Sequence, residues 1–326
     1  MRCHSLIFNI VVIFLFLFFT VQLQAGEYKH FHSDLSLSDN YSGKISFTNL
    51  STFDSTSSPV IENAPKVNYG RLVVLGGLMG GAIATIHIYQ QNGWWQNNRA
   101  PFHFQEDLVY GLHVDKIGHF YGAMILTYFI RHTVETADVS ESKSLLIGSA
   151  GALLFQTYVE VEDGFSTWGF DRVDFASDVG GALWPILQHS YPSLTNYELK
   201  FSYIPSDLLN RPGGSGFKGQ KHLIIDDYEG QTFWLSMKVK NILPESAVYY
   251  WPSFLCLSVG YGARDIAGIN ASPYRVYYLS LDYDFTKIIP DSTPLLKHLG
   301  EVLNFIHFPA PAVRISPSTI WYGLYF

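Results

Sequence analysis

Several acids, one lysine and one histidine in the middle of the chain have residue types and spacings that could support chemistry. They form three groups: Asp115, Lys116 and His119; Glu160 and Asp163; and Asp171, Asp174 and Asp178. Residues three or four apart share one face of a helix, so each group would present its polar side chains together. If the helices form a bundle, one histidine and several carboxylates could converge, and bundles build metal sites in this way. A histidine beside a carboxylate could equally act as a general acid–base pair.

These residues give two overlapping sets of candidates. The metal-ligand candidates are His119, Glu160, Asp163, Asp174 and Asp178, and the catalytic candidates are His119, Asp115, Lys116, Glu160 and Asp163. A divalent metal belongs to the first set, and no other cofactor and no cofactor-binding residue is predicted. The sequence has no glycine-rich phosphate loop, no Gly-x-Ser-x-Gly turn and no His-Glu-x-x-His pair.

The same polar residues also fit a purely structural role. Lys116 can neutralise one acid, and an acid near a helix start, such as Asp115, satisfies free backbone N–H groups there. Buried polar groups must pair with one another in any case, and such networks can fix the register of helices. A site that binds a ligand without chemistry is a third alternative. The sequence leaves these three alternatives open.

The polar groups lie on segments with helical periodicity. We predict helices over residues 71–91, 115–131, 145–161 and 173–189. Residues 72–89 carry no charged side chain and are long enough for a membrane span, although a buried core helix fits the same pattern. Two overlapping Gly-xxx-Gly steps, starting at Gly76 and Gly77, would let another helix approach closely. The other three helices have shorter apolar runs and contain acids, so we predict a compact bundle over residues 69–192.

From residue 197 onwards the hydrophobic period changes to the alternation of β-strands. Alternating runs cover residues 197–203, 233–239, 255–261, 277–285 and 320–326. The expected fold class is therefore α+β, with an N-terminal helical bundle followed by an antiparallel β-sheet or small β-barrel over residues 193–326. The end at Phe326, with apolar residues at every second position, resembles the closing strand of bacterial outer-membrane barrels. The alternative is a soluble sheet packed on the bundle. A further short strand is predicted over residues 45–50.

The beginning of the chain is typical of an exported protein. Arg2 precedes an apolar run that ends at Phe19, and the small residue Ala25 follows, so we predict a cleavable signal peptide over residues 1–25. An uncleaved anchor is the alternative. Residues 26–68 are rich in serine, threonine, asparagine, aspartate and glycine, and we predict a polar linker there.

The composition excludes some classes of function. The formal net charge of −7 argues against binding to nucleic acid, which requires a basic surface. Charged residues make up 15% of the chain, against about 25% in an average soluble domain, and aromatic residues reach 16%. Aromatic rings suit a surface between water and lipid. Because Cys3 falls in the signal region, the mature chain keeps Cys256 alone and forms no internal disulfide.

A set of ordered motifs along the chain resembles a known family. The motifs are Phe102-His103-Phe104, Asp115-Lys116-Ile117-Gly118-His119, Glu160-Val161-Glu162-Asp163-Gly164-Phe165-Ser166, Trp168-Gly169-Phe170, Asp174-xxx-Asp178-xx-Gly181, Asp227-Tyr228-Glu229-Gly230-Gln231-Thr232-Phe233-Trp234-Leu235-Ser236 and Phe308-Pro309-Ala310-Pro311. Together they resemble domain-of-unknown-function family 2279, which includes the YfiM-like predicted periplasmic lipoproteins, in its long form typical of Bacteroidetes-type bacteria. The resemblance implies an envelope protein with no established activity. The chain departs from the family in lacking a lipobox cysteine and in having Asp178 where we expect asparagine.

The sequence therefore predicts a cell-envelope protein that is secreted across the inner membrane to the periplasm or the outer membrane. We expect a structural or interaction role, with membrane lipid or envelope components as partners and no nucleic acid. One alternative is a membrane-proximal, metal-assisted hydrolase that acts on lipid or cell-wall material. The other alternative is a lipid- or glycan-binding module.

Overall fold

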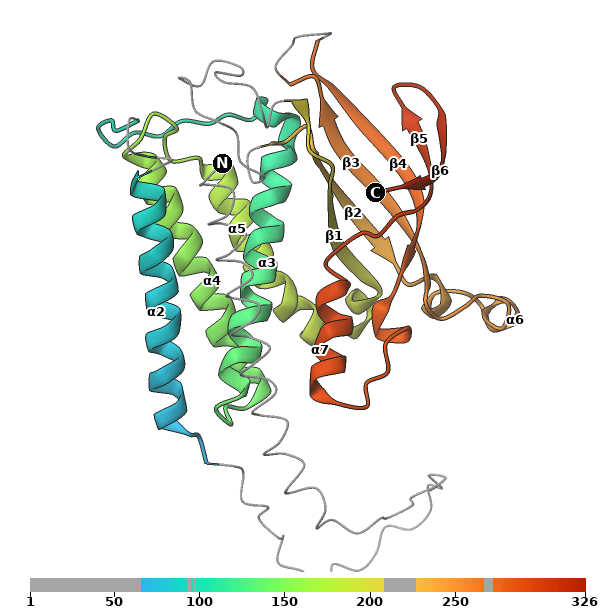
Figure 1. Ribbon diagram of the computed structural model, residues 1–326, viewed down its shortest axis with the longest axis horizontal. Helices are drawn as coiled ribbons and strands as arrows, with labels where there is room; N and C mark the ends of the chain where they lie inside the picture. Colours follow the sequence, from blue (N-terminus) through green and yellow to red (C-terminus); the bar gives the residue numbers. More distant parts are fainter. Residues whose placement is uncertain (1–65, 93–94, 96–97, 208–226, 267–271) are drawn as a thin grey trace, which may run out of the picture.

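The structure is a computed structural model that describes residues 66–92, 95, 98–207, 227–266 and 272–326. The predicted signal peptide, the predicted strand over residues 45–50 and nearly all of the predicted polar linker lie outside the described residues. Long helices form the first half of the described chain and a β-sheet forms most of the second half (Figure 1). The predicted α+β fold class is therefore confirmed.

Four long helices form the first half. They are α2 (Tyr69–Asn92), α3 (Val114–Glu135), α4 (Glu141–Gly164) and α5 (Arg172–Ser190), and each covers one of the predicted helices. Helix α3 packs against both α4 and α5, and α2 stands at the outer side of this group (Figure 1). Helix α2 contacts α3 through Leu75, which packs on Ile130 and Val134.

Small residues let α3, α4 and α5 approach one another closely. Ala123, Ala152 and Ala182 come one from each helix and are buried against one another. A side chain at Gly181 would collide with the backbone of Phe120, so only glycine fits at this crossing. The close contact brings the polar faces of the three helices within reach of one another.

The turn that leads into α3 has an unusual backbone. Gly111, Leu112 and His113 have φ angles of 58°, 50° and 73°. Residues other than glycine rarely adopt positive φ, and they persist there only when their surroundings hold them. The Tyr261 hydroxyl donates a hydrogen bond to the Leu112 carbonyl, and the Tyr228 ring lies against Gly111. Residues of the second half of the chain therefore hold the turn from which α3 starts.

The second half contains one antiparallel sheet of six strands in the order β1-β2-β3-β4-β5-β6. The strands are β1 (Tyr197–Tyr203), β2 (Gln231–Met237), β3 (Leu255–Arg264), β4 (Tyr274–Tyr283), β5 (Ala310–Ser316) and β6 (Ile320–Tyr325). The shorter helices are η1 (Tyr110–His113), η2 (Pro192–Asn196), η5 (Val239–Asn241), α6 (Glu245–Val248), η6 (Phe285–Lys287) and α7 (Pro294–Leu303). Strand β5 lies outside the alternating runs identified in the sequence, and it contains Pro311, which cannot donate a backbone hydrogen bond to a neighbouring strand.

The sheet is open, so of the two predicted alternatives the antiparallel sheet is confirmed and the small barrel is wrong for the described residues. Strands β1 and β6 lie at opposite ends of the strand order and do not pair with each other. The interpretation of the C-terminal strand as a closing strand is wrong for the same reason, since β6 pairs only with β5 among the described strands. The outer edge of β1 is partly covered, because Phe201 and His307 donate backbone hydrogen bonds of 2.9 Å to Phe305 and Phe201 respectively.

The buried face of the sheet, here called the inner face, carries polar side chains, and the opposite or outer face carries apolar ones. The inner face buries Lys200 and Asp282 completely, with 3.2 Å between the Lys200 ammonium and the Asp282 carboxylate. The outer face exposes apolar side chains, among them Leu235 and Val259, which are 48% and 51% exposed. Helix α3 contacts β2 and β3 and so covers only part of this outer face. Part of the apolar outer face is therefore left uncovered by the described residues.

Candidate functional site

The side chain of Lys116 is buried near the start of α3 and is surrounded by carboxylates. Its Nζ lies 3.1 Å from Asp115 Oδ2 and 3.0 Å from Asp171 Oδ2. It also lies 3.0 Å from Asp174 Oδ2 and pairs with Asp107, which precedes α3. Burial acts to lower the pKa of Lys116, but the carboxylates raise it above its usual range, so the ammonium stays charged. Although Asp107, Asp115 and Asp174 could form a cation site by their spacing, the Lys116 ammonium already contacts all three.

The start of α5 is fixed by the same network. Asp171 caps this helix, and its Oδ1 accepts hydrogen bonds from the backbone N–H groups of Val173 at 2.7 Å and Asp174 at 3.3 Å. Burial acts to raise the pKa of Asp171, but hydrogen bonds from the backbone and from Lys116 lower it to about 2. A cap of this kind satisfies backbone donors that the first helical turn leaves free. The capping carboxylate thus joins the α5 terminus to α3.

His119 lies one turn further along α3 and faces acids from α4 and α5. Its Nδ1 lies 3.1 Å from Asp178 Oδ1 and 3.6 Å from Glu160 Oε1, and its Nε2 lies 3.9 Å from Asp174 Oδ2. Gln156 Nε2 donates to the same Asp178 oxygen at 2.7 Å. Burial acts to lower the pKa of His119, but its carboxylate neighbours raise it to about 10. The His119 side chain is 24% exposed, so solvent reaches this side of the cluster.

The acid–histidine cluster contains more acids than cations. Its six carboxylates are those of Asp107, Asp115, Glu160, Asp171, Asp174 and Asp178. They face the two cationic side chains of Lys116 and His119, so four negative charges are in excess if every group is ionised. Burial, together with neighbouring carboxylates, raises the pKa of Asp115 to about 7 and that of Glu160 to about 8. The cluster therefore favours uptake of positive charge, either as protons or as a bound cation.

Three buried carboxylate oxygens in the cluster have no hydrogen-bond partner. They are Asp115 Oδ1, Asp174 Oδ1 and Asp178 Oδ2. A buried polar atom without a partner costs about 1–3 kcal/mol, so each calls for an explanation. His119, Glu160 and Asp178 each offer one ligand atom, and these atoms lie within 4.8 Å of one another. These three residues are where the cluster could best hold a divalent cation.

Asp163 is the predicted residue that the structure sets apart. Its carboxylate is half-buried next to the cluster, but its Oδ1 accepts a hydrogen bond of 2.6 Å from Trp95 Nε1. Burial raises the pKa of Asp163 to about 6. Asp163 is therefore bonded to Trp95 and not directly to His119.

Two residues of the cluster were missed by the sequence analysis. Gln156 lies four residues before Glu160, so helical spacing could have identified it as a neighbour of the acids. Asp107 lies in an irregular segment ahead of α3, and no periodic signal marks it. The fold alone brings Asp107 to Lys116.

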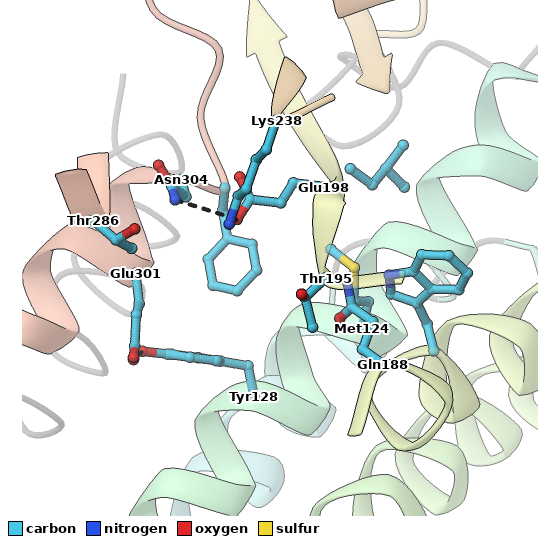
Figure 2. Close-up of a pocket in the computed structure, with 12 residues that line it drawn as sticks. Met124, Tyr128, Gln188, Thr195, Glu198, Lys238, Thr286, Glu301 and Asn304 are labelled. Atoms are coloured by element: carbon cyan, nitrogen blue, oxygen red, sulfur yellow. Dashed lines mark hydrogen bonds and ion pairs between the residues drawn. The ribbon is translucent and has the colours of Figure 1, made fainter. Parts of the chain in front are cut away.

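A cavity of about 200 Å³ lies away from the cluster, where α3, the sheet and the segment around α7 meet (Figure 2). It is lined by Met124, Tyr128, Trp184, Gln188, Thr195, Glu198, Leu199, Lys238, Thr286, Glu301, Asn304 and Phe305. Lys238 Nζ lies 2.7 Å from Glu198 Oε1 on one side, and the Tyr128 hydroxyl donates to Glu301 at 2.7 Å on another. None of the predicted site residues lines this cavity.

The fold and the acid–histidine cluster define a class of protein: a helical bundle with an ionic core, joined to an open antiparallel sheet. The family model described as "Predicted periplasmic lipoprotein (DUF2279)" matches residues 103–190, which contain α3, α4 and α5 together with the cluster. The match confirms, for this segment, the family resemblance that the motifs suggested, and the family's description supports a location in the cell envelope. Comparisons with curated proteins and with solved structures found no match.

Proposed function

We propose that this chain is a membrane-attached envelope protein with a structural or interaction role, and that helix α2 is its contact with lipid. The observation that supports this is the exposure of an apolar helix. Tyr69–Ile88 has a mean hydropathy of 1.6, and only 6% of its apolar stretch is buried. Val73 and Val74 are 75% and 62% exposed. A helix on the surface of a soluble protein has a polar face, whereas about 20 apolar residues suit the core of a bilayer.

The surroundings of α2 support the same proposal. Nothing lies within 4 Å of a Cβ placed on Gly76 or Gly77, so the close helix approach predicted from these glycines is not made within the described chain. Among the described helices, α4 is the other one that is long and apolar enough to cross a membrane, although a third of its apolar stretch is buried. Its Leu154 is 72% exposed. Contact with lipid would remove these apolar surfaces from water, where their exposure is unfavourable.

Carbonate extraction of membranes tests this proposal. The full chain should remain in the membrane pellet, while a variant with Val74→Asp and Ile83→Asp in α2 should be released. The side chains of Val74 and Ile83 are both exposed, so the fold itself should tolerate the two substitutions. A matched control carries Ser142→Asp and Ser190→Asp at exposed positions outside α2. Release of the unaltered chain, or equal retention of both variants, would contradict the proposal.

A second candidate function is a metal-assisted hydrolase that acts on lipid or cell-wall material. The observation that favours it is the unpartnered Asp178 Oδ2, which is fully buried beside His119 and Glu160. A divalent cation held there would satisfy this oxygen and part of the excess negative charge. Because the His119 side chain is partly exposed, a water molecule could reach the cation, and a metal-bound water is the usual nucleophile of such hydrolases.

Metal analysis of the purified full chain separates this candidate from a purely structural network. The hydrolase requires bound metal that is lost in a His119→Ala, Asp178→Asn variant and kept in the control His189→Ala, whose side chain is 42% exposed. Equal metal content in both variants would eliminate the candidate. The cavity of about 200 Å³ is smaller than the roughly 300–1,000 Å³ of typical ligand sites, so it gives lipid or glycan binding no specific support.

A further inference from the structure

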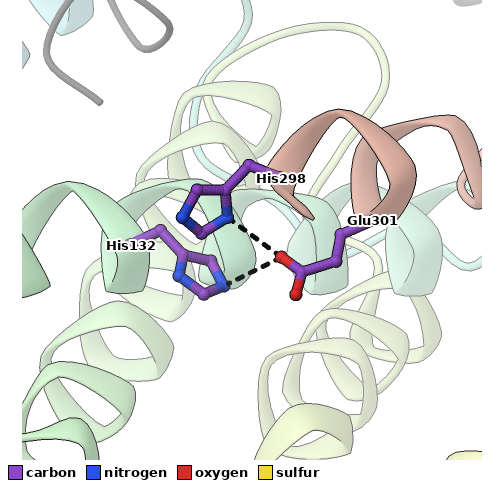
Figure 3. A group of neighbouring side chains, drawn as sticks. All are labelled: His132, His298 and Glu301. Atoms are coloured by element: carbon purple, nitrogen blue, oxygen red, sulfur yellow. Dashed lines mark hydrogen bonds and ion pairs between the residues drawn. The ribbon is translucent and has the colours of Figure 1, made fainter. Parts of the chain in front are cut away.

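We propose that His132, His298 and Glu301 form a zinc site that ties helix α3 to helix α7. His132 comes from α3, and His298 and Glu301 lie one turn apart on α7, so the group joins the helical half to the C-terminal half (Figure 3). One ligand atom from each residue lies within 4.8 Å of the other two. This group is distinct from the acid–histidine cluster and does not depend on the proposed function.

The spacing of the three ligand atoms fits a small tetrahedral ion. Glu301 Oε2 lies 3.0 Å from His298 Nδ1 and 4.0 Å from His132 Nε2. Zinc binds histidine nitrogen and carboxylate oxygen at about 2.0–2.2 Å, which in a tetrahedron separates two ligand atoms by about 3.3 Å. These two separations lie on either side of this value, and the third, between the two histidine nitrogens, is no more than 4.8 Å. Side-chain rotations would therefore be needed to bring all three atoms to the ion. Two imidazoles and one carboxylate are a ligand set typical of zinc.

The second nitrogen of His132 is already held as it is in metal sites. His132 Nδ1 pairs with Glu135 Oε2 at 2.8 Å, and Glu135 is held in turn by Arg131 Nε at 2.9 Å. Metal-binding histidines commonly donate their other ring N–H to a carboxylate, which orients the ring and makes the free nitrogen a better ligand. Here the pair with Glu135 turns His132 Nε2 toward Glu301.

The surroundings of the group supply the remaining features of a binding site. His132 and His298 are 8% and 9% exposed, so the ligands are shielded from bulk solvent. Tyr128 and Glu301 also line the cavity, and the Tyr128 hydroxyl donates to Glu301 Oε2 at 2.7 Å. With three protein ligands, the fourth position on the ion would be taken by a water from the cavity side. An open fourth position of this kind is the pattern of reactive zinc sites.

Zinc titration of the metal-free full chain tests the site. We expect one equivalent of tightly bound Zn²⁺ that is lost in His298→Ala and kept in His189→Ala. Substitution with Co²⁺ should give the visible absorption of a tetrahedral nitrogen–oxygen site. The variant Glu135→Gln should keep the stoichiometry but weaken the zinc affinity about 10- to 100-fold, because it alters only the partner of a ligand.

Two further measurements keep the result unambiguous. His119→Ala should leave this zinc equivalent in place, which separates the site from any cation in the acid–histidine cluster. If His298→Ala fails to fold, a rise in the melting temperature of the unaltered chain on adding Zn²⁺, reduced in Glu135→Gln, would support the site. Absence of zinc binding by the folded, unaltered chain would overturn the proposal, as would full zinc binding by folded His298→Ala.

Discussion

Replacing Lys116 with methionine would test whether the ionic core of the bundle is held by this one ammonium. Methionine keeps most of the length of the side chain but removes the charge that Asp107, Asp115, Asp171 and Asp174 surround. The side chain is only 7% exposed, so water cannot replace the lost ammonium without opening the helix contact. The carboxylates would then repel one another in a buried setting.

The expected loss of stability follows from this burial. Removing one partner of a buried ion pair costs about 3–5 kcal/mol, because the remaining charge stays buried without compensation. For domains of 150–250 residues each kcal/mol lowers the melting temperature by about 2–4 °C, so Lys116→Met should melt about 6–20 °C lower than the unaltered chain. Burial already raises the pKa of Asp115 to about 7. Protonation of Asp115 would therefore reduce the repulsion and keep the fall in melting temperature near the lower end of this range.

Thermal unfolding of the full chain in detergent, followed by circular dichroism, measures the effect. The matched control is Lys143→Met, because Lys143 is exposed on α4 and should change the melting temperature little. Adding Asp115→Asn to Lys116→Met should recover part of the loss, since it removes one of the repelling charges. If Lys116→Met melts with the unaltered chain, the carboxylates do not depend on the ammonium and the interpretation of the core is wrong.

Other substitutions test the packing and the caps. Gly181→Ala should prevent close contact of α5 with the α3 backbone and lower the melting temperature sharply, whereas Gly77→Ala has open space and should leave it unchanged or raise it. Asp171→Ala removes the cap of α5 and should cost about 2 kcal/mol in denaturant unfolding; an unchanged midpoint would argue against the cap. Trp95→Phe removes the hydrogen bond to Asp163 and should cost about 1.5–3 kcal/mol in the same assay, with no effect if the bond is absent.

The long elements could be predicted because each has a strong local pattern. Helical spacing located α2 to α5, and period-two alternation located β1, β2, β3, β4 and β6. Whether the sheet is open or closed could not be predicted from the sequence. Alternation shows that a strand has two unlike faces, but it does not show which strands pair. It also did not show that the outer face, with Leu235 and Val259, would be the exposed one. Strand pairing depends on contacts between distant residues that no local pattern records.

The acid–histidine cluster was only partly predictable for a related reason. His119 lies on α3 and Asp178 on α5, and the spacing along each helix indicated which polar residues share its face. The sequence does not show how the helices are rotated relative to one another. It also could not show that Asp163 would accept a hydrogen bond from Trp95. His132 and His298 were not singled out at all, because 165 positions separate them and only the docking of α7 on α3 brings their rings to 4.7 Å.

The left-handed turn at Gly111, Leu112 and His113 makes the helical half dependent on the rest of the chain. Its supports, Tyr261 on Leu112 and Arg275 at 3.3 Å from His113, belong to strands β3 and β4, outside the 103–190 segment of the family match. Non-glycine residues in this conformation store about 1–3 kcal/mol each, which external contacts must hold in place. A chain trimmed to the matched segment would therefore lose the brace on its own first turn. The sheet therefore holds the backbone conformation from which α3 starts. The position of the ionic core thus depends on residues of β3 and β4 that lie far from it in the sequence.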